Sequence, residues 1–236
     1  MNRRQYLQTT ATLLGVGGVA GCLEDSPTAL DSLYDIESEE LSFPANGETL
    51  PSVEVPAPLH DTTISTDEFV GERETLLAFI FTRCPDQSCH AMVNAFANVQ
   101  SEARYNDYED EVALMPITFD PEYDTAGQLA SFSQGHQADP YADSWYALRP
   151  ETPEDAEAVV RDTFGVWYEA IPADDADDGE HEDAGYDLDA EEQTFAHVNL
   201  IILANRDGYV ERSYFGDLPS SADLIEDLRK VRSVFA

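Results

Sequence analysis

The chain has 236 residues, enough for one domain of ordinary size plus tails. Its hydrophobic content of 42%, with 10% aromatic residues, excludes wholesale disorder. The 48 Asp and Glu residues outnumber the 12 Lys and Arg residues, for a net charge of −36, and this sign argues against a nucleic-acid partner.

The first 21 residues have the features of an export signal. Arg3 and Arg4 lie in a segment that resembles a twin-arginine signal, and the apolar run at 11–21 is shorter than the ~20 residues that a membrane span needs. The residues Val-Ala-Gly-Cys at 19–22 resemble a lipoprotein cleavage box, with Cys22 as the lipidated N-terminus. We therefore expect a lipoprotein anchored to the outer face of the cell membrane, in an oxidising compartment. The alternative is a cytoplasmic start with a chance arginine pair.

Residues 22–47 are acidic and weakly patterned, and we interpret them as a tether between the membrane and a domain over 48–236. In that domain, the continuous apolar run at 75–81 predicts a central strand covered on both faces. From Cys89 to Ala103, apolar residues recur every three or four positions, which predicts a helix. A second buried strand is expected at 112–119 and a helix at 125–137.

The C-terminal half continues the same alternation. A helix is expected at 153–164 and a strong strand at 195–203, and the turn at Asp207-Gly208 leads into a further strand at 209–215. Ser220 or Ser221 would cap a last helix that runs to Phe235. This order predicts an α/β fold, a thioredoxin-like sandwich with a mixed central sheet flanked by helices.

An acidic insertion at about 172–193 interrupts the pattern, because 11 of the 19 residues from Asp174 to Glu192 are Asp or Glu. Such a segment cannot bury enough apolar surface to order itself, so we interpret it as a solvated loop; weak binding of divalent cations, with His181, is the alternative. The acidic residues are spread along the whole chain. This favours adaptation to high salt, where charges are screened within about 3 Å, over an acidic ligand-binding surface.

Two cysteines follow Cys22 in the chain. Cys84 lies in the turn that leaves the first buried strand, and Cys89 in the first turn of the next helix. Free N–H groups and the helix dipole lower thiol pKa values there. Two such thiols can close reversibly into a disulfide or bind a soft metal ion. A static structural disulfide is also possible, but a loop this short would make it worth at most ~2 kcal/mol.

His197 is the candidate third ligand. It lies in an otherwise apolar strand, where a histidine is costly unless it has a partner. Taken alone, it fits a hydrogen-bonded core histidine better than a ligand. Two thiolates and one imidazole, however, form a soft set that suits Cu(I) and can also hold Cu(II).

Four segments in the same order resemble the Sco (SenC) family of membrane-anchored, thioredoxin-like proteins, over roughly residues 50–235. They are Phe81-Thr82-Arg83-Cys84-Pro85-Asp86, Thr118 to Thr125 with Asp-Pro-Glu at its centre, Trp145 with Leu148, and Phe195-Ala196-His197 followed by the Asp207-Gly208 turn. The resemblance implies a copper-binding chaperone that delivers copper to the binuclear copper site of cytochrome c oxidase. It also implies Cys84, Cys89 and His197 as copper ligands and the copper-receiving subunit of a terminal oxidase as partner.

The chain departs from the family pattern at three places. Four residues instead of three separate Cys84 from Cys89, and the extra residue can rotate Cys89 on its helix. His90 stands where the family has proline; it is either a substitute ligand or, as we favour, an exposed side chain. Ala196 replaces the aspartate that often precedes the histidine, so a possible hydrogen-bond partner of the ligand is absent.

The other candidate residues have simpler interpretations. His60 and His136 have no motif around them and are expected on the surface. Asp120 and Asp124 would make a carboxylate pair, but Asp124 fits better as the N-cap of the helix that begins at Thr125.

The sequence therefore favours a copper chaperone, a binding protein rather than an enzyme. The main alternative is a thiol–disulfide oxidoreductase, in which Cys84 and Cys89 are a redox pair that reduces the cysteines of a copper-receiving partner. That function would not need His197. A peroxiredoxin fits less well, because that family has a threonine three residues before its reactive cysteine and Thr82 lies two before Cys84.

Overall fold

The computed structural model describes residues 27–34, 40–171 and 194–235. The export signal, Cys22 and the acidic insertion with His181 lie outside these residues. Within the described ranges, no helix is both long enough and apolar enough to cross a membrane.

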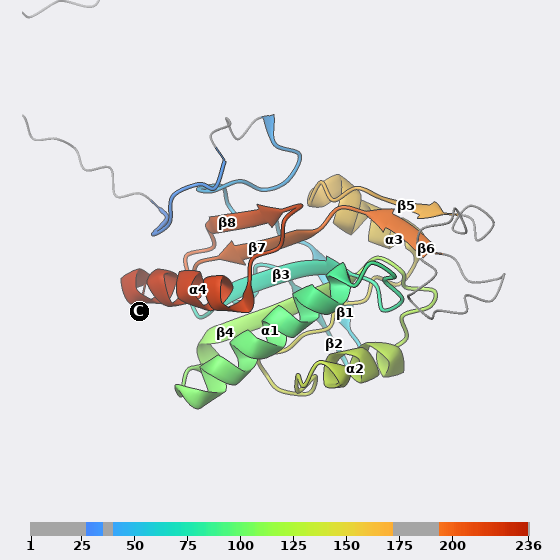
Figure 1. Ribbon diagram of the computed structural model, residues 1–236, viewed down its shortest axis with the longest axis horizontal. Coiled ribbons are helices and arrows are strands. Elements are labelled where there is room, and N and C mark those ends of the chain that lie inside the picture. Colours follow the sequence, from blue (N-terminus) through green and yellow to red (C-terminus); the bar gives the residue numbers. More distant parts are fainter. Residues whose placement is uncertain (1–26, 35–39, 172–193, 236) are drawn as a thin grey trace, which may run out of the picture.

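The elements follow one another as Figure 1 shows. They are β1 (Glu54–Ala57), β2 (Thr62–Ser65), β3 (Glu74–Ile80), α1 (Ser88–Tyr105), the 3₁₀ turn η2 (Glu109–Glu111), β4 (Val112–Thr118), α2 (Ala126–Gly135), α3 (Pro153–Ala156), the π-helical η3 (Glu157–Thr163), β5 (Tyr168–Ile171), β6 (Thr194–His197), β7 (Leu200–Ala204), β8 (Val210–Phe215) and α4 (Ser221–Phe235).

A four-stranded sheet in the order β4-β3-β7-β8 forms the centre of the fold. β3 pairs in parallel with β4 and antiparallel with β7, and β7 pairs antiparallel with β8. α1 and α4 pack against each other across one face of this sheet (Figure 1). The predicted α/β class is confirmed, and a parallel β-α-β unit joined to an antiparallel hairpin and a helix is the thioredoxin-like arrangement.

The two central strands are where the apolar runs predict them. Every residue of β3 and of β4 is buried, as expected for strands covered on both faces. Phe79 of β3 packs against Phe164 at the end of η3, with ring centroids 5.1 Å apart. The expected helix at 153–164 is formed, although its backbone is π-helical from Glu157 to Thr163.

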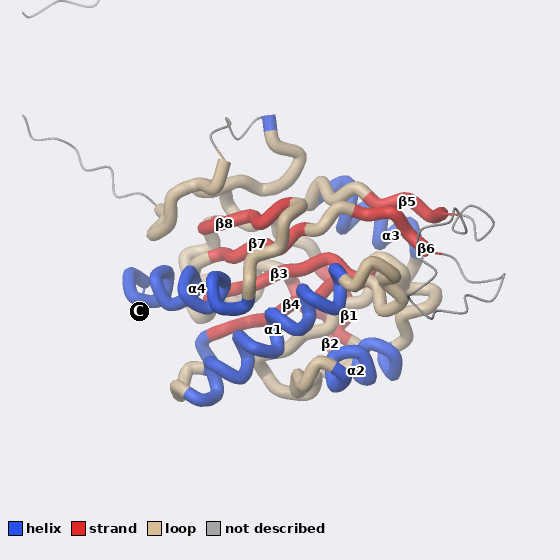
Figure 2. The backbone as a smooth tube through the Cα atoms, in the orientation of Figure 1, coloured by secondary structure: helices blue, strands red, loops and turns tan. Residues whose placement is uncertain are grey.

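The single strand expected at 195–203 is wrong, because the chain breaks at Val198-Asn199. β6 pairs with β5 in a separate two-stranded ribbon, and only β7 joins the central sheet (Figure 2). Phe195 and Ala196 of β6 and all of β7 are apolar and extended, so the apolar pattern alone runs through the break. It places His197 at the end of β6, outside the central sheet.

Much of the segment interpreted as a tether is packed against the domain. The carboxylate of Glu211 on β8 accepts hydrogen bonds from the backbone N–H groups of Ala29 and Leu30 at 2.8–3.0 Å. Phe43 stacks on Phe215, with ring centroids 4.5 Å apart. Leu30 and Phe43 are both buried, so described residues before position 48 are already part of the packed domain.

Candidate metal centre

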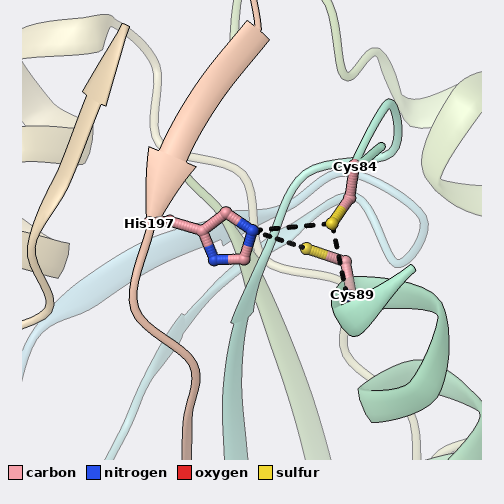
Figure 3. A group of neighbouring side chains, drawn as sticks. All are labelled: Cys84, Cys89 and His197. Carbon is pink, nitrogen blue, oxygen red and sulfur yellow. Dashed lines mark hydrogen bonds between the residues drawn. The ribbon is translucent and has the colours of Figure 1, made fainter. Parts of the chain in front are cut away.

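Cys84, Cys89 and His197 converge beside the C-terminal end of β3. Their ligand atoms all lie within 4.8 Å of one another, and the Nε2 edge of the imidazole points at both sulfur atoms (Figure 3). Nε2 is 3.5 Å from the Sγ of Cys84 and 4.0 Å from the Sγ of Cys89. Within the described ranges, no other group of three histidine, cysteine or carboxylate side chains is close enough to share an ion.

Three separate elements supply these side chains. Cys84 lies in the loop that leaves β3, Cys89 is the second residue of α1, and His197 ends β6. Both cysteines are free thiols, and all three side chains are nearly inaccessible, with exposed fractions of 1%, 0% and 2%. The cluster is therefore formed by the tertiary fold, and it is shielded from bulk water.

The longer spacing between the cysteines does not turn Cys89 away. Gln87, the N-cap of α1, adopts a left-handed backbone with φ 65°, which lets the loop absorb an additional residue. The Cys89 N–H donates to Cys84 Sγ at 3.5 Å, and Cys89 Sγ accepts from the Phe81 N–H at 3.5 Å. The possible rotation of Cys89 out of the site is thus not observed.

The two thiols differ in their acidity. The hydrogen bond from the Cys89 thiol lowers the pKa of Cys84 to about 5, helped by His197 and Ser88 and opposed by burial. Complete burial raises the pKa of Cys89 well above its usual range, and the neighbouring Cys84 adds to that effect. Cys84 is therefore the more acidic of the two thiols, and the one that ionises first.

Asp86 is a participant that the sequence reasoning did not single out. Its Oδ1 accepts hydrogen bonds from the Cys84 thiol at 2.9 Å and from the N–H and hydroxyl of Ser88 at 2.9 and 2.7 Å. The contact with Cys84 opposes ionisation of that thiol. Because the Asp86 side chain is 60% exposed, it is free to turn to solvent when Cys84 ionises.

Aromatic rings hold the imidazole of His197. Phe81 and Phe119 lie edge-on or tilted to it, with centroids 5.5 and 5.6 Å away. Among the residues that the structure describes, the buried Nδ1 has no hydrogen-bond partner, in agreement with the alanine at position 196. The ring is therefore oriented by packing, and Nε2 is the nitrogen that faces the sulfur atoms.

Asp124 supports the loop that carries Cys84 and does not cap a helix. Its carboxylate accepts hydrogen bonds from the Thr82 N–H, the Thr82 hydroxyl and the Thr118 hydroxyl. The expected N-cap role is wrong, because Thr125 caps α2 in a capping box with Gln128. Asp120 is paired separately with Arg83 at 2.9 Å, so the two aspartates do not act as a carboxylate pair.

The remaining histidines differ from expectation. His90 is half-buried, and it faces His136 with 3.2 Å between Nδ1 and Nε2, outside the cluster with Cys84. It is therefore neither a substitute ligand nor a freely exposed side chain. His136 and His60 are also half-buried, and Nε2 of His60 lies 2.7 Å from the backbone oxygen of Trp145.

The cluster has dimensions that suit a single ion. With metal bonds of roughly 2.0 Å to nitrogen and 2.3 Å to sulfur, a nitrogen and a sulfur on one ion lie about 3.5–3.7 Å apart. The distances of 3.5 and 4.0 Å are close to that range. Only small side-chain shifts would place all three ligand atoms on one ion.

Comparison with known proteins gives a consistent result. The sequence profile of the SCO1/SenC family matches residues 59–233. A SCO1/SenC family lipoprotein from Bacillus anthracis is 19% identical, with a TM-score of 0.58 over 81% of this chain and 96% of that one. No curated protein sequence matches the chain.

Two further solved structures have the same fold. BsSco, a member of the Sco family of cytochrome c oxidase assembly proteins in which a disulfide switch was identified, is 20% identical, with a TM-score of 0.57 over 83% of this chain and 99% of that one. ScoI of Bradyrhizobium japonicum, solved with copper bound, is 20% identical, with a TM-score of 0.57 over 78% and 99%. At these identities the likeness establishes the shared fold.

Proposed function

The chain belongs to the SCO1/SenC family, and from this we propose that it is a copper-binding chaperone whose cargo is held by Cys84, Cys89 and His197. The observation that carries the proposal is the convergence of two sulfur atoms and one imidazole nitrogen from three different elements. Thiolate and imidazole are ligands that suit copper. The copper-bound relative from Bradyrhizobium japonicum supports the choice of ion.

Delivery to the binuclear copper site of cytochrome c oxidase is the second part of the proposal. It is supported by BsSco, whose family is described as assembling that enzyme. Three protein ligands leave a coordination position open, at which a thiolate of the copper-receiving subunit can enter. Copper would then pass by ligand exchange, past the exposed side chain of Asp86 at the edge of the site.

The cellular location is proposed from the N-terminal sequence. Cys22, lipidated after removal of residues 1–21, would anchor the protein to the outer face of the membrane. One acyl chain alone anchors only marginally, so more than one lipid chain is expected. Cell fractionation tests this: Cys22→Ser should move the protein from membranes to the medium, and full retention on membranes would contradict the anchor.

A thiol–disulfide oxidoreductase is the second candidate, and the difference in thiol acidity favours it. The thiolate of Cys84 is the form that attacks a disulfide, and Cys89 is held next to it as the resolving thiol. In this function the Cys84 thiolate attacks the partner's disulfide, which breaks that S–S bond, releases one partner thiol and forms a mixed disulfide. Cys89 then loses its proton and displaces the second partner thiol, and the chain is left with the oxidised Cys84–Cys89 disulfide. The disulfide switch identified in BsSco supports this alternative.

Copper binding by three single variants of the full chain separates the two functions. In molar KCl, Cys84→Ser and Cys89→Ser should each abolish binding of Cu(I) and of Cu(II) at the cluster of Cys84, Cys89 and His197, followed for Cu(II) by its sulfur-to-copper charge-transfer band. His197→Ala should weaken Cu(I) binding only modestly, because two thiolates suffice for Cu(I), and should weaken Cu(II) binding by two or more orders of magnitude. His60→Ala is the matched control and should leave both affinities unchanged.

The rate of disulfide exchange, measured on the same proteins, completes the test. A reductase would lose exchange in either cysteine variant and be indifferent to His197→Ala. Equal Cu(II) affinity of the thiol cluster in wild type and His197→Ala, measured from the sulfur-to-copper charge-transfer band, would refute the three-ligand site and leave the redox function as the better explanation.

A further inference from the structure

A second pair of metal-binding side chains lies outside the cysteine cluster. His90 is in the first turn of α1, and His136 is the C-cap residue of α2. Nδ1 of His90 and Nε2 of His136 are 3.2 Å apart, and the two ring centroids are 5.2 Å apart. Two imidazole nitrogens from different helices thus face each other at hydrogen-bonding distance.

Packing fixes this geometry. The ring of Phe132, one turn before His136 on α2, contacts both imidazoles edge-on, with centroids 4.8 Å from His90 and 5.1 Å from His136. Both histidines are half-buried, so their rings are restrained and the pair remains partly accessible to solvent. Little side-chain entropy would therefore be lost when an ion binds.

The separation of the two nitrogens matches that of two ligands on one ion. With metal–nitrogen bonds of about 2.0–2.1 Å and a tetrahedral angle, two nitrogens lie roughly 3.3 Å apart. Burial and the charge of His90 lower the pKa of His136, which reduces competition from protons. Without a metal ion, one proton lies between Nδ1 of His90 and Nε2 of His136. A bound ion would take the place of that proton.

We propose that His90 and His136 form a second metal site, which chelates a divalent transition-metal ion with water completing the coordination. Imidazole nitrogen suits copper, nickel and zinc, and Cu(II) is bound most tightly of the first-row divalent ions. The pair is distinct from the thiol cluster, although His90 directly follows Cys89 in the chain. Cys89 faces Phe81 and His197, whereas His90 faces α2. The proposal therefore does not depend on the function proposed for the thiols.

A full-length chain that lacks the first site provides the test. In the triple variant Cys84→Ser, Cys89→Ser, His197→Ala, titration with Cu(II) in molar KCl, with glycine as competitor, should still show one bound ion. Its electron paramagnetic resonance spectrum, recorded without glycine, should show hyperfine coupling to two nitrogens, and no sulfur-to-copper charge-transfer band should appear. Adding His90→Ala or His136→Ala should weaken this binding at least tenfold, and adding His60→Ala should not change it.

Two further variants guard against a loss of structure. His90→Gln and His136→Gln retain a polar side chain of similar length but remove an imidazole ligand, and thermal midpoints establish that each variant is folded. The glutamine variants should also bind Cu(II) at least tenfold more weakly than the triple variant. Copper binding that is the same in the triple variant with and without His90 and His136, or a spectrum without two nitrogens, would assign the ion to surface carboxylates and overturn the proposal.

Discussion

Asp124 is a buried carboxylic acid at the junction between β4 and the loop that carries Cys84. Its side chain is inaccessible to solvent, and burial raises its pKa to about 6, although the hydroxyl groups of Thr118 and Thr82 donate hydrogen bonds that oppose the change. Thr82 is two residues before Cys84, so this carboxylate holds the loop in place. The protonation state of Asp124 therefore affects the free energy of unfolding of the protein.

We expect Asp124 to make the protein less stable as pH rises from about 4 to about 6. The unfolded chain releases this proton near pH 3.8 and the folded chain near 6, so the stabilising contribution is complete below 3.8 and is lost by 6. The corresponding free energy is about 3 kcal/mol. Urea unfolding of wild type and Asp124→Asn in molar KCl measures it, because effects of the other carboxylates cancel in the difference. A difference that is independent of pH would contradict this coupling.

At the scale of elements, residues 40–47, which precede β1, pack against the domain. Residues 40–47 pass over Gly165, which follows η3 and has a left-handed φ of +68°. A Cβ at position 165 would lie 1.5 Å from the backbone oxygen of Ser42. Gly71 also has a positive φ, +90°, but a Cβ there would meet no atom of the described residues within 4 Å.

This pair of glycines tests whether the segment is docked. Gly71→Ala should cost about 1 kcal/mol of unfolding free energy, from backbone strain alone. Gly165→Ala should cost about 3 kcal/mol or more, because the backbone at Ser42 must also move away. Urea unfolding of the two variants gives the comparison. Equal losses would mean that residues 40–47 do not press on Gly165 in solution.

At the scale of the whole molecule, the net charge of −36 dominates the electrostatics. Some acidic groups are neutralised: Arg206 and Arg232 both contact Glu111, at 3.1 and 2.7 Å, and both lie beside the buried Glu74, at 3.6 and 3.7 Å. With 12 basic residues for 48 acidic ones, most carboxylates have no cation to pair with. Their mutual repulsion opposes the compact state.

We therefore expect the thermal midpoint to rise steeply with KCl. The Debye length falls from about 10 Å at 0.1 M to about 3 Å at 1 M, which screens repulsion between carboxylates. Sucrose of matched osmolality is the control, because it favours the compact state by exclusion from the surface without screening charge. A midpoint that is flat in KCl, or that rises equally in sucrose, would argue against a halophilic surface.

Several features can be predicted from the sequence alone because each corresponds to a pattern in neighbouring residues. Continuous apolar runs record burial on both faces, so β3 and β4 are where they are predicted, and the helical period locates α1. The order of the motif segments predicts the family, which the profile match confirms. Cys84, Cys89 and His197 are identified by residue type and position, and the structure brings them together.

Other features depend on contacts between residues far apart in the chain, and only the tertiary structure determines them. The break between β6 and β7 arises because β6 pairs with β5, and Leu30 is ordered by Glu211, 181 residues away. The pairing of His90 with His136 depends on how α1 meets α2. No local pattern in the sequence encodes these partners. Burial can be predicted from composition along a segment, but the identity of the group that a buried or polar side chain meets is set by the packing of the whole fold.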